Sequence, residues 1–420
     1  MYYCSVMSED GIPSPPPKQA PCPRVPLDLS AAQSNGKSSE VPEVSRLVLG
    51  CQHLARYRDP FAFLDAAYAY GINAFDCAVA YGTDDILGRW HTERGIPRSK
   101  LFFLVKGAHP EGDPGVAPNR VNKAAIEADL AKALRELRTT YADVYMLHRD
   151  DPEEADLPEV AACLDKIVRD GKARAYGLCN WTPARIDAAA FAASERRLVQ
   201  PAAFSAMYSM TLPKTPLYVD TTLIDETARY HYVSFGKPVF AWAALCHGFA
   251  SGKYDEKECA NATSGMNKFV KAKFGTRENW LKMQRARIMA SKYRCTVSQI
   301  AVAYVCRTPG LDAFAIVGSR SGDVSRIEEA VVGAHVRLSE ADWAYLDLAD
   351  ERESAAREEH AEDVVAFEAH RKKALKVAKA VQRAEFWRKV MDVCGLRSSL
   401  RAWAFRVGLI GRSVKLADLS

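Results

Sequence analysis

Residues 143–180 read DVYMLHRDDPEEADLPEVAACLDKIVRDGKARAYGLCN, and they contain one copy of the pattern that decides the fold. The apolar run 144–147 is followed by a helix-like segment and then by a second apolar run, 173–178. Apolar runs without polar alternation are typical of strands buried on both faces, as in parallel sheets. This stretch therefore predicts a strand, a helix and a second, parallel strand.

The same pattern extends in both directions and spans about residues 44–352. We expect Asp59 and Pro60 to open the first helix and Gly71 to end it, because these residue types favour the two helix termini. Eight apolar runs alternate with helical segments, which predicts a (β/α)8 TIM barrel in the α/β class. The predicted strands cover residues 46–49, 72–75, 101–105, 144–147, 173–178, 202–207, 239–245 and 313–317.

A doubly wound dinucleotide-binding sheet is the main alternative for such an alternation. It requires a glycine-rich Gly-x-Gly-x-x-Gly turn directly after the first strand. The first predicted strand instead runs into Gly50-Cys51-Gln52-His53, and this turn is missing. The sequence thus favours the barrel, and any dinucleotide must be held by other means.

The two flanks of the predicted barrel differ from it in composition. Residues 1–43 contain seven prolines between positions 13 and 26, which predicts a disordered N-terminal arm. Residues 353–420 predict a helical, basic C-terminal extension: residues 354–420 hold 14 Lys and Arg against 8 Asp and Glu. Its apolar stripe is expected to pack on the protein itself or on a second subunit rather than on an anionic membrane. The stripe consists of Leu400, Trp403, Val407 and Ile410.

Composition excludes several classes of protein. No run of 18 uncharged apolar residues occurs, so no transmembrane helix is expected. Eleven scattered cysteines without a Cys-x-x-Cys pair argue against a disulfide framework or a metal site, and they predict reduced thiols and a cytoplasmic location. The net charge of +5 comes from the C-terminal extension, so no nucleic-acid partner is expected.

Polar side chains stand at the ends of several predicted strands, where the loops of a barrel converge on one mouth. A carboxylate, a phenol, an ammonium and an imidazole together suit proton transfer to a carbonyl oxygen. The residues at these ends are Asp76, Tyr81, Lys106, His148, Asn180 and Ser319.

Four of these residues predict the chemistry of a carbonyl reduction. Tyr81 is the expected proton donor, and Lys106 is expected to lower the pKa of its phenol. Asp76 would keep Lys106 charged and oriented, and His148 would donate a hydrogen bond to the carbonyl oxygen. No side chain supplies a hydride, so this reaction needs a cofactor and a small-molecule carbonyl or alcohol substrate.

Six motifs in this order resemble the aldo-keto reductase family. The resemblance covers about residues 44–352. The motifs are FDCAVAYG (75–82), DILG (85–88), VK (105–106), DVYMLH (143–148), GKARAYGLCN (171–180) and VGSRS (317–321).

The resemblance implies an NADP(H)-dependent reductase or alcohol dehydrogenase with Asp76, Tyr81, Lys106 and His148 as its catalytic residues. It also implies NADP(H) binding across the barrel mouth, with Asn180 at the carboxamide, Trp242 stacked on the nicotinamide and Glu329 at the adenine. Arg320, Ser321 and Arg326 would then contact the 2′-phosphate. The complete set of implied cofactor-binding residues is Asp76, Cys179, Asn180, Ser205, Trp242, Ala243, Leu245, Gly248, Ser251, Lys253, Ser319, Arg320, Ser321, Arg326 and Glu329.

Three positions depart from the family pattern. Cys179 replaces a serine, Ser205 stands where a glutamine is usual, and Ala330 follows Glu329 where asparagine is common. Gln200 lies five residues before Ser205, and we favour Ser205 as the equivalent position. These departures leave a second hypothesis open, in which the barrel is an NADP(H)-binding regulatory or redox-sensing subunit with little turnover.

Overall fold

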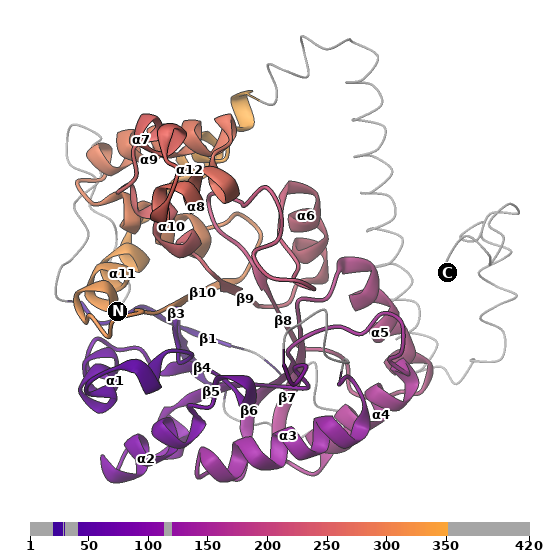
Figure 1. The fold of residues 1–420 in the computed structure, drawn as a ribbon. Coiled ribbons are helices and arrows are strands. Elements are labelled where there is room, and N and C mark those ends of the chain that lie inside the picture. The colour runs from indigo at the N-terminus through magenta and orange to yellow at the C-terminus, as the bar shows by residue number, and fades with distance from the viewer. Residues whose placement is uncertain (1–19, 28, 30–40, 113–119, 352–420) are drawn as a thin grey trace, which may run out of the picture. The chain divides into compact units, whose positions relative to one another are not determined.

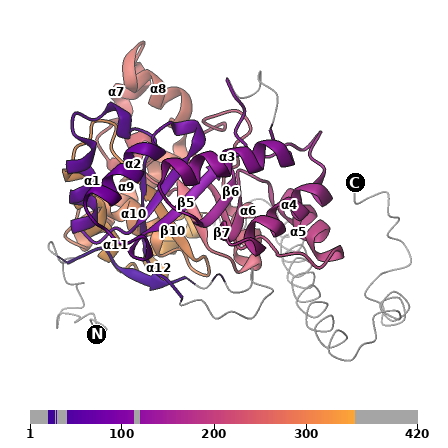
Figure 2. The same ribbon diagram turned by 90° about the horizontal axis from the view of Figure 1, so that it is seen from below.

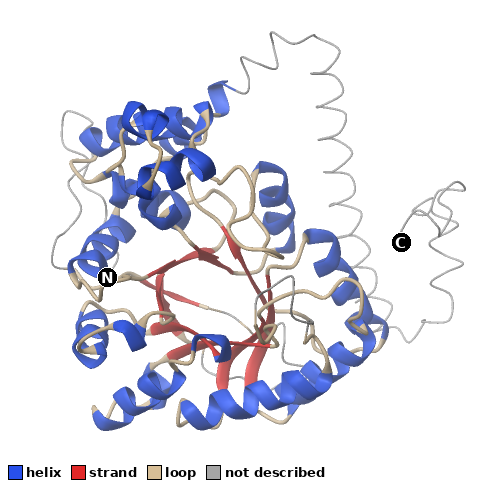
Figure 3. Cartoon of the chain, viewed as in Figure 1, coloured by secondary structure: helices blue, strands red, loops and turns tan. Residues whose placement is uncertain are grey.

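The computed structural model describes residues 20–27, 29, 41–112 and 120–351 of the 420-residue chain. Eight parallel strands close into a barrel in the order β10-β3-β4-β5-β6-β7-β8-β9, which confirms the predicted TIM barrel. Figure 3 shows these strands as a ring with helices around the outside. The barrel strands are β3 (Leu47–Gly50), β4 (Ala74–Ala78), β5 (Phe102–Gly107), β6 (Ala142–Leu147), β7 (Ala173–Cys179), β8 (Ala203–Met207), β9 (Val239–Trp242) and β10 (Ala313–Val317).

Each predicted apolar run overlaps one barrel strand, and β10 has the predicted bounds. The strand β9 is shorter than predicted, because it ends at Trp242 instead of residue 245. The next residue, Ala243, has a φ of 54°, and this left-handed conformation does not continue a strand. The apolar residues after it belong to a turn at the barrel mouth.

Helices surround the barrel in the order labelled in Figure 1. The α-helices are α1 (Pro60–Ala69), α2 (Asp84–Glu93), α3 (Lys123–Glu136), α4 (Leu157–Arg169), α5 (Pro183–Glu195), α6 (Glu226–Phe235), α7 (Glu256–Asn261), α8 (Gly265–Phe274), α9 (Arg277–Lys292), α10 (Val297–Cys306), α11 (Ser325–His335) and α12 (Glu340–Leu346). Short 3₁₀ helices are η2 (Leu54–Arg56), η3 (Val79–Tyr81), η4 (Arg98–Lys100) and η5 (Cys246–Ser251). The β9–β10 connection contains four α-helices, all outside the ring of strands in Figure 1, and Figure 2 shows α7 and α8 projecting beyond the others.

Local sequence explains how the first helices begin and pack. The Asp59 side chain accepts a hydrogen bond from the Ala62 N–H at the start of α1, as the sequence predicts. Gly88 allows α2 to approach α3 closely, because a Cβ at this position would lie 2.0 Å from the Glu136 carbonyl oxygen. Without this glycine the helix that follows Tyr81 could not pack where it does.

Aromatic side chains fill the barrel near the amino ends of its strands. Phe240 stacks on Phe102 and on Phe314, with ring centroids 6.0 and 5.2 Å apart. The Arg46 guanidinium lies 4.7 Å from the Phe314 ring centroid and forms an ion pair with Asp312. Because this end is packed with large apolar side chains, the polar strand ends are left to the opposite, carboxyl end.

The predicted disordered arm is wrong for residues 20–27. Within it, β1 (Arg24–Pro26) pairs antiparallel with β2 (Glu43–Ser45). The Cys22 N–H donates to the Tyr70 carbonyl, and the guanidinium of Arg24 donates to the Gly71 carbonyl. The prediction failed here because a high proline content was taken to indicate disorder. A proline is nevertheless tolerated at the end of a strand on a sheet edge. The rest of the predicted arm lies outside the described residues.

The chain divides into a unit of residues 1–348 and a unit of residues 349–420. The predicted basic extension (353–420) and its apolar stripe lie outside the described residues and stay a prediction, as does its oligomer contact. Among the helices of the described ranges, none is long and apolar enough to cross a membrane.

Candidate functional site at the barrel mouth

The four predicted catalytic residues come from three adjacent strands and the turn after the first of them. Asp76 lies within β4, Lys106 within β5, and His148 directly follows β6. Tyr81 is the last residue of η3, and Gly82 ends that turn with a φ of 64°. The parallel register places Ala78 of β4 opposite Lys106 of β5, so all four side chains reach the same end of the barrel.

Three of these side chains form a closed triangle of contacts. The Lys106 Nζ lies 2.7 Å from Asp76 Oδ1, and it donates to the Tyr81 hydroxyl at 3.3 Å. The Tyr81 hydroxyl in turn donates to Asp76 Oδ2 at 3.5 Å. Asp76 and Lys106 are buried, with 3% and 2% of their surface exposed, whereas Tyr81 is half-buried. The phenol is thus the member of the triangle that a substrate reaches.

The pKa shifts of Lys106 and Tyr81 indicate which groups of the triangle are protonated at neutral pH. Burial by itself would lower the pKa of Lys106, but the nearby Asp76 and Tyr81 raise it, so the amine stays charged. Burial and then the charge of Asp76 raise the pKa of Tyr81, although Lys106 acts in the opposite direction. The predicted lowering by Lys106 is thus present, but burial and Asp76 together outweigh it, so the net shift of the Tyr81 pKa is upward. At neutral pH the phenol carries its proton.

His148 faces Tyr81 as a neutral imidazole. The two rings meet edge to face, with centroids 5.6 Å apart and planes at 84°. Burial, followed by the positive charge of Lys106, lowers the pKa of His148 well below its usual value. Its buried Nδ1 has no hydrogen-bond partner among the described residues. A neutral imidazole retains one N–H, which is the group that hydrogen-bonds a carbonyl oxygen.

Gly107 keeps space for this arrangement. A Cβ at Gly107 would lie 2.1 Å from the Tyr145 hydroxyl oxygen, which is buried and donates to the Ile126 carbonyl. Any side chain at this position would therefore displace the Tyr145 ring and collide with Asp129 on α3. The glycine next to Lys106 is a packing requirement of the site.

Asn180 lies directly after β7 in a left-handed conformation with a φ of 64°. Its Nδ2 donates to the His148 carbonyl at 3.2 Å, and its Oδ1 accepts from the Trp242 indole N–H at 3.1 Å. The amide is thus fixed between the ends of β6 and β9. The predicted pair Asn180 and Trp242 is brought together, although the indole is hydrogen-bonded to the amide.

Cys179 and Ser205 are paired neighbours on β7 and β8. Both are buried, and the Ser205 hydroxyl donates to the Phe240 carbonyl at 2.7 Å. Gln200 lies before β8, and its amide donates to the Leu198 carbonyl at 3.2 Å. Ser205 therefore occupies the strand position beside Cys179, and Gln200 does not.

The turn after β9 contains several residues with left-handed backbone. Ala243, Cys246 and His247 have φ values of 54°, 47° and 53°, and Gly248 follows with 87°. The Ser251 hydroxyl donates to the Gly248 carbonyl at 2.7 Å. A Cβ at Gly248 would lie 3.2 Å from the Lys253 Nζ, so this amine rests over the glycine. The turn thus places a glycine beside a cation, and the cofactor contacts of Gly248, Ser251 and Lys253 stay a prediction.

The loop after β10 is held by its neighbours. The Ser319 hydroxyl lies 3.3 Å from that of Ser321 and accepts from the Asp323 N–H. The Tyr57 hydroxyl donates to the Ser319 carbonyl, and the Arg320 guanidinium donates to His247 Nδ1 at 2.9 Å. This last hydrogen bond joins the loop to the turn after β9. Arg320 itself is exposed.

Two predicted adenosine contacts are engaged with each other. Arg326 lies 3.7 Å from Glu329 and 3.7 Å from Asp323. The Glu329 carboxylate also accepts from the Thr296 hydroxyl at 2.9 Å, at the start of α10. The arrangement holds α11 against α10, and the adenine contact of Glu329 stays a prediction.

With this geometry established, sequence comparison places the chain among known proteins. The model of the aldo/keto reductase family matches residues 46–351. The chain belongs to the aldo/keto reductase family. One relative is an uncharacterized oxidoreductase, YrpG, of Bacillus subtilis strain 168, which is 24% identical over 312 residues, or 70% of this chain and 89% of the relative. Another is a putative voltage-gated potassium channel subunit beta of Schizosaccharomyces pombe, which is 25% identical over 276 residues, or 64% of this chain and 77% of the relative.

The family implies a nicotinamide dinucleotide, and the donor set of this aldo/keto reductase fits such a cofactor. Lys253 and Arg320 are cations held at the turn after β9, and the hydroxyl groups of Ser319 and Ser321 lie beside Arg320 in sequence. Cations and hydroxyl groups of this kind suit phosphate oxygens. The Asn180 amide at the other end of the mouth has the right chemistry for a carboxamide.

Two residues of this aldo/keto reductase site were missed by sequence reasoning. His247 orders Arg320, and Arg149 is buried next to His148. Arg149 directly follows the motif DVYMLH (143–148), so its place near the barrel mouth could have been predicted from the sequence. His247 carried none, because its partner Arg320 lies 73 residues away in sequence.

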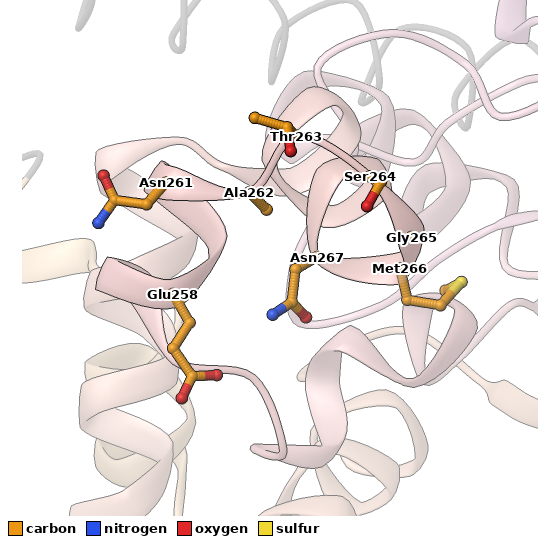
Figure 4. A pocket seen from close by; sticks show the side chains of 8 residues that line it. All are labelled: Glu258, Asn261, Ala262, Thr263, Ser264, Gly265, Met266 and Asn267. Carbon is orange, nitrogen blue, oxygen red and sulfur yellow. The ribbon is translucent and has the colours of Figure 1, made fainter.

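A separate hollow of about 570 Å³ lies between α7 and α8. Figure 4 shows Glu258 and Asn261 on α7 on one side of it and Asn267 on α8 on the other. Its lining residues include one carboxylate but no cation and no aromatic ring. It therefore lacks the proton donor and the charge pair of the barrel mouth. Among the described residues no cluster of His, Cys, Asp and Glu is suited to a metal ion.

Proposed function

We propose that this chain is an NADPH-dependent oxidoreductase that reduces an aldehyde or ketone to an alcohol, or catalyses the reverse reaction. The observation that carries the proposal is the triangle of Asp76, Lys106 and Tyr81 with the neutral His148 beside it. These groups lie at one end of the barrel and leave one half-buried phenol to face a substrate. Neither relative's name specifies a substrate, so the substrate class rests on this chemistry.

Each residue has a distinct part in the reaction. His148 donates a hydrogen bond to the carbonyl oxygen and orients it toward the Tyr81 hydroxyl. Tyr81 gives its proton to that oxygen as negative charge develops there, and the Lys106 ammonium stabilises the phenolate that remains. Asp76 holds Lys106 in place through the 2.7 Å ion pair. In the alcohol-oxidising direction the phenolate takes the proton back.

NADP(H), when bound, supplies or accepts the hydride. In this proposal Asn180 and Trp242 position the nicotinamide end, and Cys179 and Ser205 line the strand ends beneath it. Asp76 borders the same end, and the turn residues Ala243, Leu245, Gly248, Ser251 and Lys253 lie along the pyrophosphate. Ser319, Arg320, Ser321 and Arg326 hold the 2′-phosphate, and Glu329 contacts the adenine. The preference for NADPH over NADH depends on the four residues that hold the 2′-phosphate.

A second candidate function is an NADP(H)-binding regulatory or redox-sensing subunit with little turnover. The hydrogen bonds of Asn180 favour it, because its amide already serves His148 and Trp242 and the adjacent strand positions hold Cys179 and Ser205. The name of the Schizosaccharomyces pombe relative, a putative channel subunit, is in line with this candidate. The intact proton-transfer triangle favours the enzyme.

One experiment separates the two functions. The purified full-length protein is mixed with NADPH and a panel of aldehydes and ketones, and absorbance at the nicotinamide band is followed while calorimetry measures NADPH binding. We expect multiple turnovers with at least one aldehyde. NADPH binding without turnover would support the regulatory subunit, and absence of binding would refute both.

A further inference from the structure

Arg149 directly follows His148 and is a buried cation without a carboxylate partner among the described residues. It is 7% exposed, and its Nη1 donates to the His148 carbonyl at 3.2 Å. Its Nε is fully buried and has no hydrogen-bond acceptor among the described residues. In the part of the chain that the structure describes, no carboxylate oxygen lies within 4.0 Å of this guanidinium, although several other arginines have such partners.

The carboxylates nearest to Arg149 in sequence, and that of Asp76, contact other groups. Asp150 accepts two hydrogen bonds from Arg185, at 2.9 and 3.0 Å. One oxygen of Asp151 accepts from the Glu154 N–H at 3.1 Å. Asp76 is paired with Lys106 at 2.7 Å. None of these three carboxylates forms an ion pair with Arg149.

The guanidinium lies beside the residues that handle the carbonyl group. The His148 carbonyl accepts both from Arg149 and from the Asn180 amide, so these two groups converge on one atom. Burial is the main cause of the lowered pKa values of His148 and His109, and the charge of Arg149 lowers both further. Arg149 is thus close to both imidazoles.

His109 completes this wall of the mouth. Its ring lies 4.8 Å from that of His148, and Ala108 turns the chain toward it with a left-handed φ of 57°. The His109 Nδ1 contacts the Pro110 carbonyl at 2.9 Å. A carbonyl only accepts, so this nitrogen carries the proton and Nε2 is left as an acceptor. His148, His109 and Arg149 thus lie close together beside the mouth, and no carboxylate of the described residues pairs with Arg149.

We propose that Arg149 binds a carboxylate on the carbonyl substrate, so that the natural substrates are aldehydes or ketones that also carry an acid group. A buried cation is costly unless an anion pairs with it, and a guanidinium matches a carboxylate with two parallel hydrogen bonds. The inference rests on the proposed reductase function and adds the substrate class to it. A cofactor phosphate has related chemistry and is the alternative source of the anion.

The test compares 2-, 3- and 4-carboxybenzaldehyde with the matching methylbenzaldehydes, because the ring fixes the distance from the carboxylate to the carbonyl carbon. For at least one isomer we expect kcat/KM of the acid to exceed that of its neutral partner by about 10-fold or more. Arg149→Met should lower this ratio about 10- to 100-fold, the usual range for one charge-assisted hydrogen bond. The matched control is Arg174→Met, which removes an arginine at the amino end of β7, and the ratio should stay unchanged.

Arg149→Lys keeps the charge but loses the planar fork, so KM for the acid should rise while part of the preference remains. Arg149→Lys also tests the proposed carboxylate site if Arg149→Met does not fold. A ratio that is the same in wild type, Arg149→Met and Arg149→Lys would overturn the proposal. Weaker NADPH binding by Arg149→Met with an unchanged ratio would also overturn it and assign the anion to the cofactor.

If the wild type turns over none of the aldehydes, the proposed reductase function fails on its own. The carboxylate site is then tested by calorimetry of 4-carboxybenzyl alcohol binding in the presence of NADPH. Binding that disappears in Arg149→Met and persists in Arg174→Met supports the site. No binding to the wild type overturns it.

Discussion

The two halves of the barrel mouth are built differently. The half formed by the ends of β4, β5 and β6 is the dry half, because its charged pair, Asp76 and Lys106, is buried away from solvent. The charged atoms of this pair lie 2.7 Å apart. The half formed by the loops after β9 and β10 is open: Arg320 and Arg326 are exposed, and hydrogen bonds between loops, such as that of Arg320 to His247, hold it together. In the proposed function, the proton transfer falls to side chains fixed by strands, and the phosphate binding falls to side chains fixed by turns.

This contrast predicts that substitutions in the dry half act on rate and folding. Substitutions in the open half should act on cofactor affinity alone, because exposed loop residues contribute little to stability. We expect four effects, ordered from the largest to the smallest; that of Asp84 concerns the helix α2 after Tyr81, and the other three separate the two halves.

Tyr81→Phe should lower kcat by 10²-fold or more and leave the Kd for NADPH within a factor of about three. The variant removes the proton donor, and a positioned general acid typically contributes 10²- to 10⁴-fold. Stopped-flow turnover with an aldehyde and fluorescence titration with NADPH measure the two quantities. Tyr141→Phe, at the amino end of β6, is the matched control and should be neutral. Wild-type turnover by Tyr81→Phe would remove Tyr81 from the mechanism.

Lys106→Met should lower the free energy of unfolding by roughly 3–5 kcal/mol, because it leaves the buried Asp76 carboxylate without its partner. It should also raise the pKa that governs residual activity, since Lys106 alone lowers that of Tyr81. The double variant Asp76→Asn/Lys106→Met removes both charges and should regain part of the stability. Urea unfolding measures the free energies. Equal stability of Lys106→Met and wild type would show that water reaches the Asp76 carboxylate and replaces its partner.

Asp84, in the first turn of α2, should make stability depend on pH. Burial, then the charge of Glu136, raises the pKa of Asp84 from 3.8 to about 7, and neither oxygen has a hydrogen-bond partner among the described residues. The folded state therefore binds the proton more tightly than the unfolded state. The resulting stabilisation is present below about pH 4 and is lost as the pH rises to 7. One pKa unit is worth about 1.4 kcal/mol, so the loss amounts to at most roughly 4 kcal/mol.

Asp84→Asn should abolish this loss, so its stability relative to wild type should rise between pH 4 and pH 8. The neighbouring Asp85→Asn is the control, because Asp85 is exposed and pairs only with Arg89 on the helix surface. An exposed pair of this kind contributes under about 1 kcal/mol. Thermal melts of the three proteins at both pH values decide the matter. A constant difference between Asp84→Asn and wild type would contradict the buried-carboxylate interpretation.

Arg320→Ala should weaken NADPH binding by roughly 1.5–3 kcal/mol, the range for a hydrogen bond to a charged group, and NADH binding much less. Arg326→Ala should act in the same direction, although Arg326 also contacts Asp323 and Glu329. Neither change should shift the melting temperature of the free protein by more than about 2 °C, and Arg196→Ala serves as the exposed control. Equal losses for both nucleotides would refute the phosphate role and with it the division of the mouth.

Much of the dry half was predictable, because a strand end is a local feature. An apolar run buries a strand, and the first polar residue after it must lie at the carboxyl end of the barrel, as Lys106 and His148 do. The open half was less predictable. Ser319 and Arg320 lie in the predicted loop, but the partners of Glu329 and Arg320 come from α10 and the turn after β9.

By itself the sequence determined the barrel, the order of its strands along the chain and the placement of Asp76, Tyr81, Lys106 and His148 at one end. These follow from periodicity and from motif spacing, which depend on neighbouring residues. Only the tertiary structure decided the sign of the Tyr81 pKa shift, the strand within the proline-rich arm, and the lack of a carboxylate partner for Arg149 among the described residues. These depend on burial and on contacts between residues far apart in the chain, which no local pattern encodes.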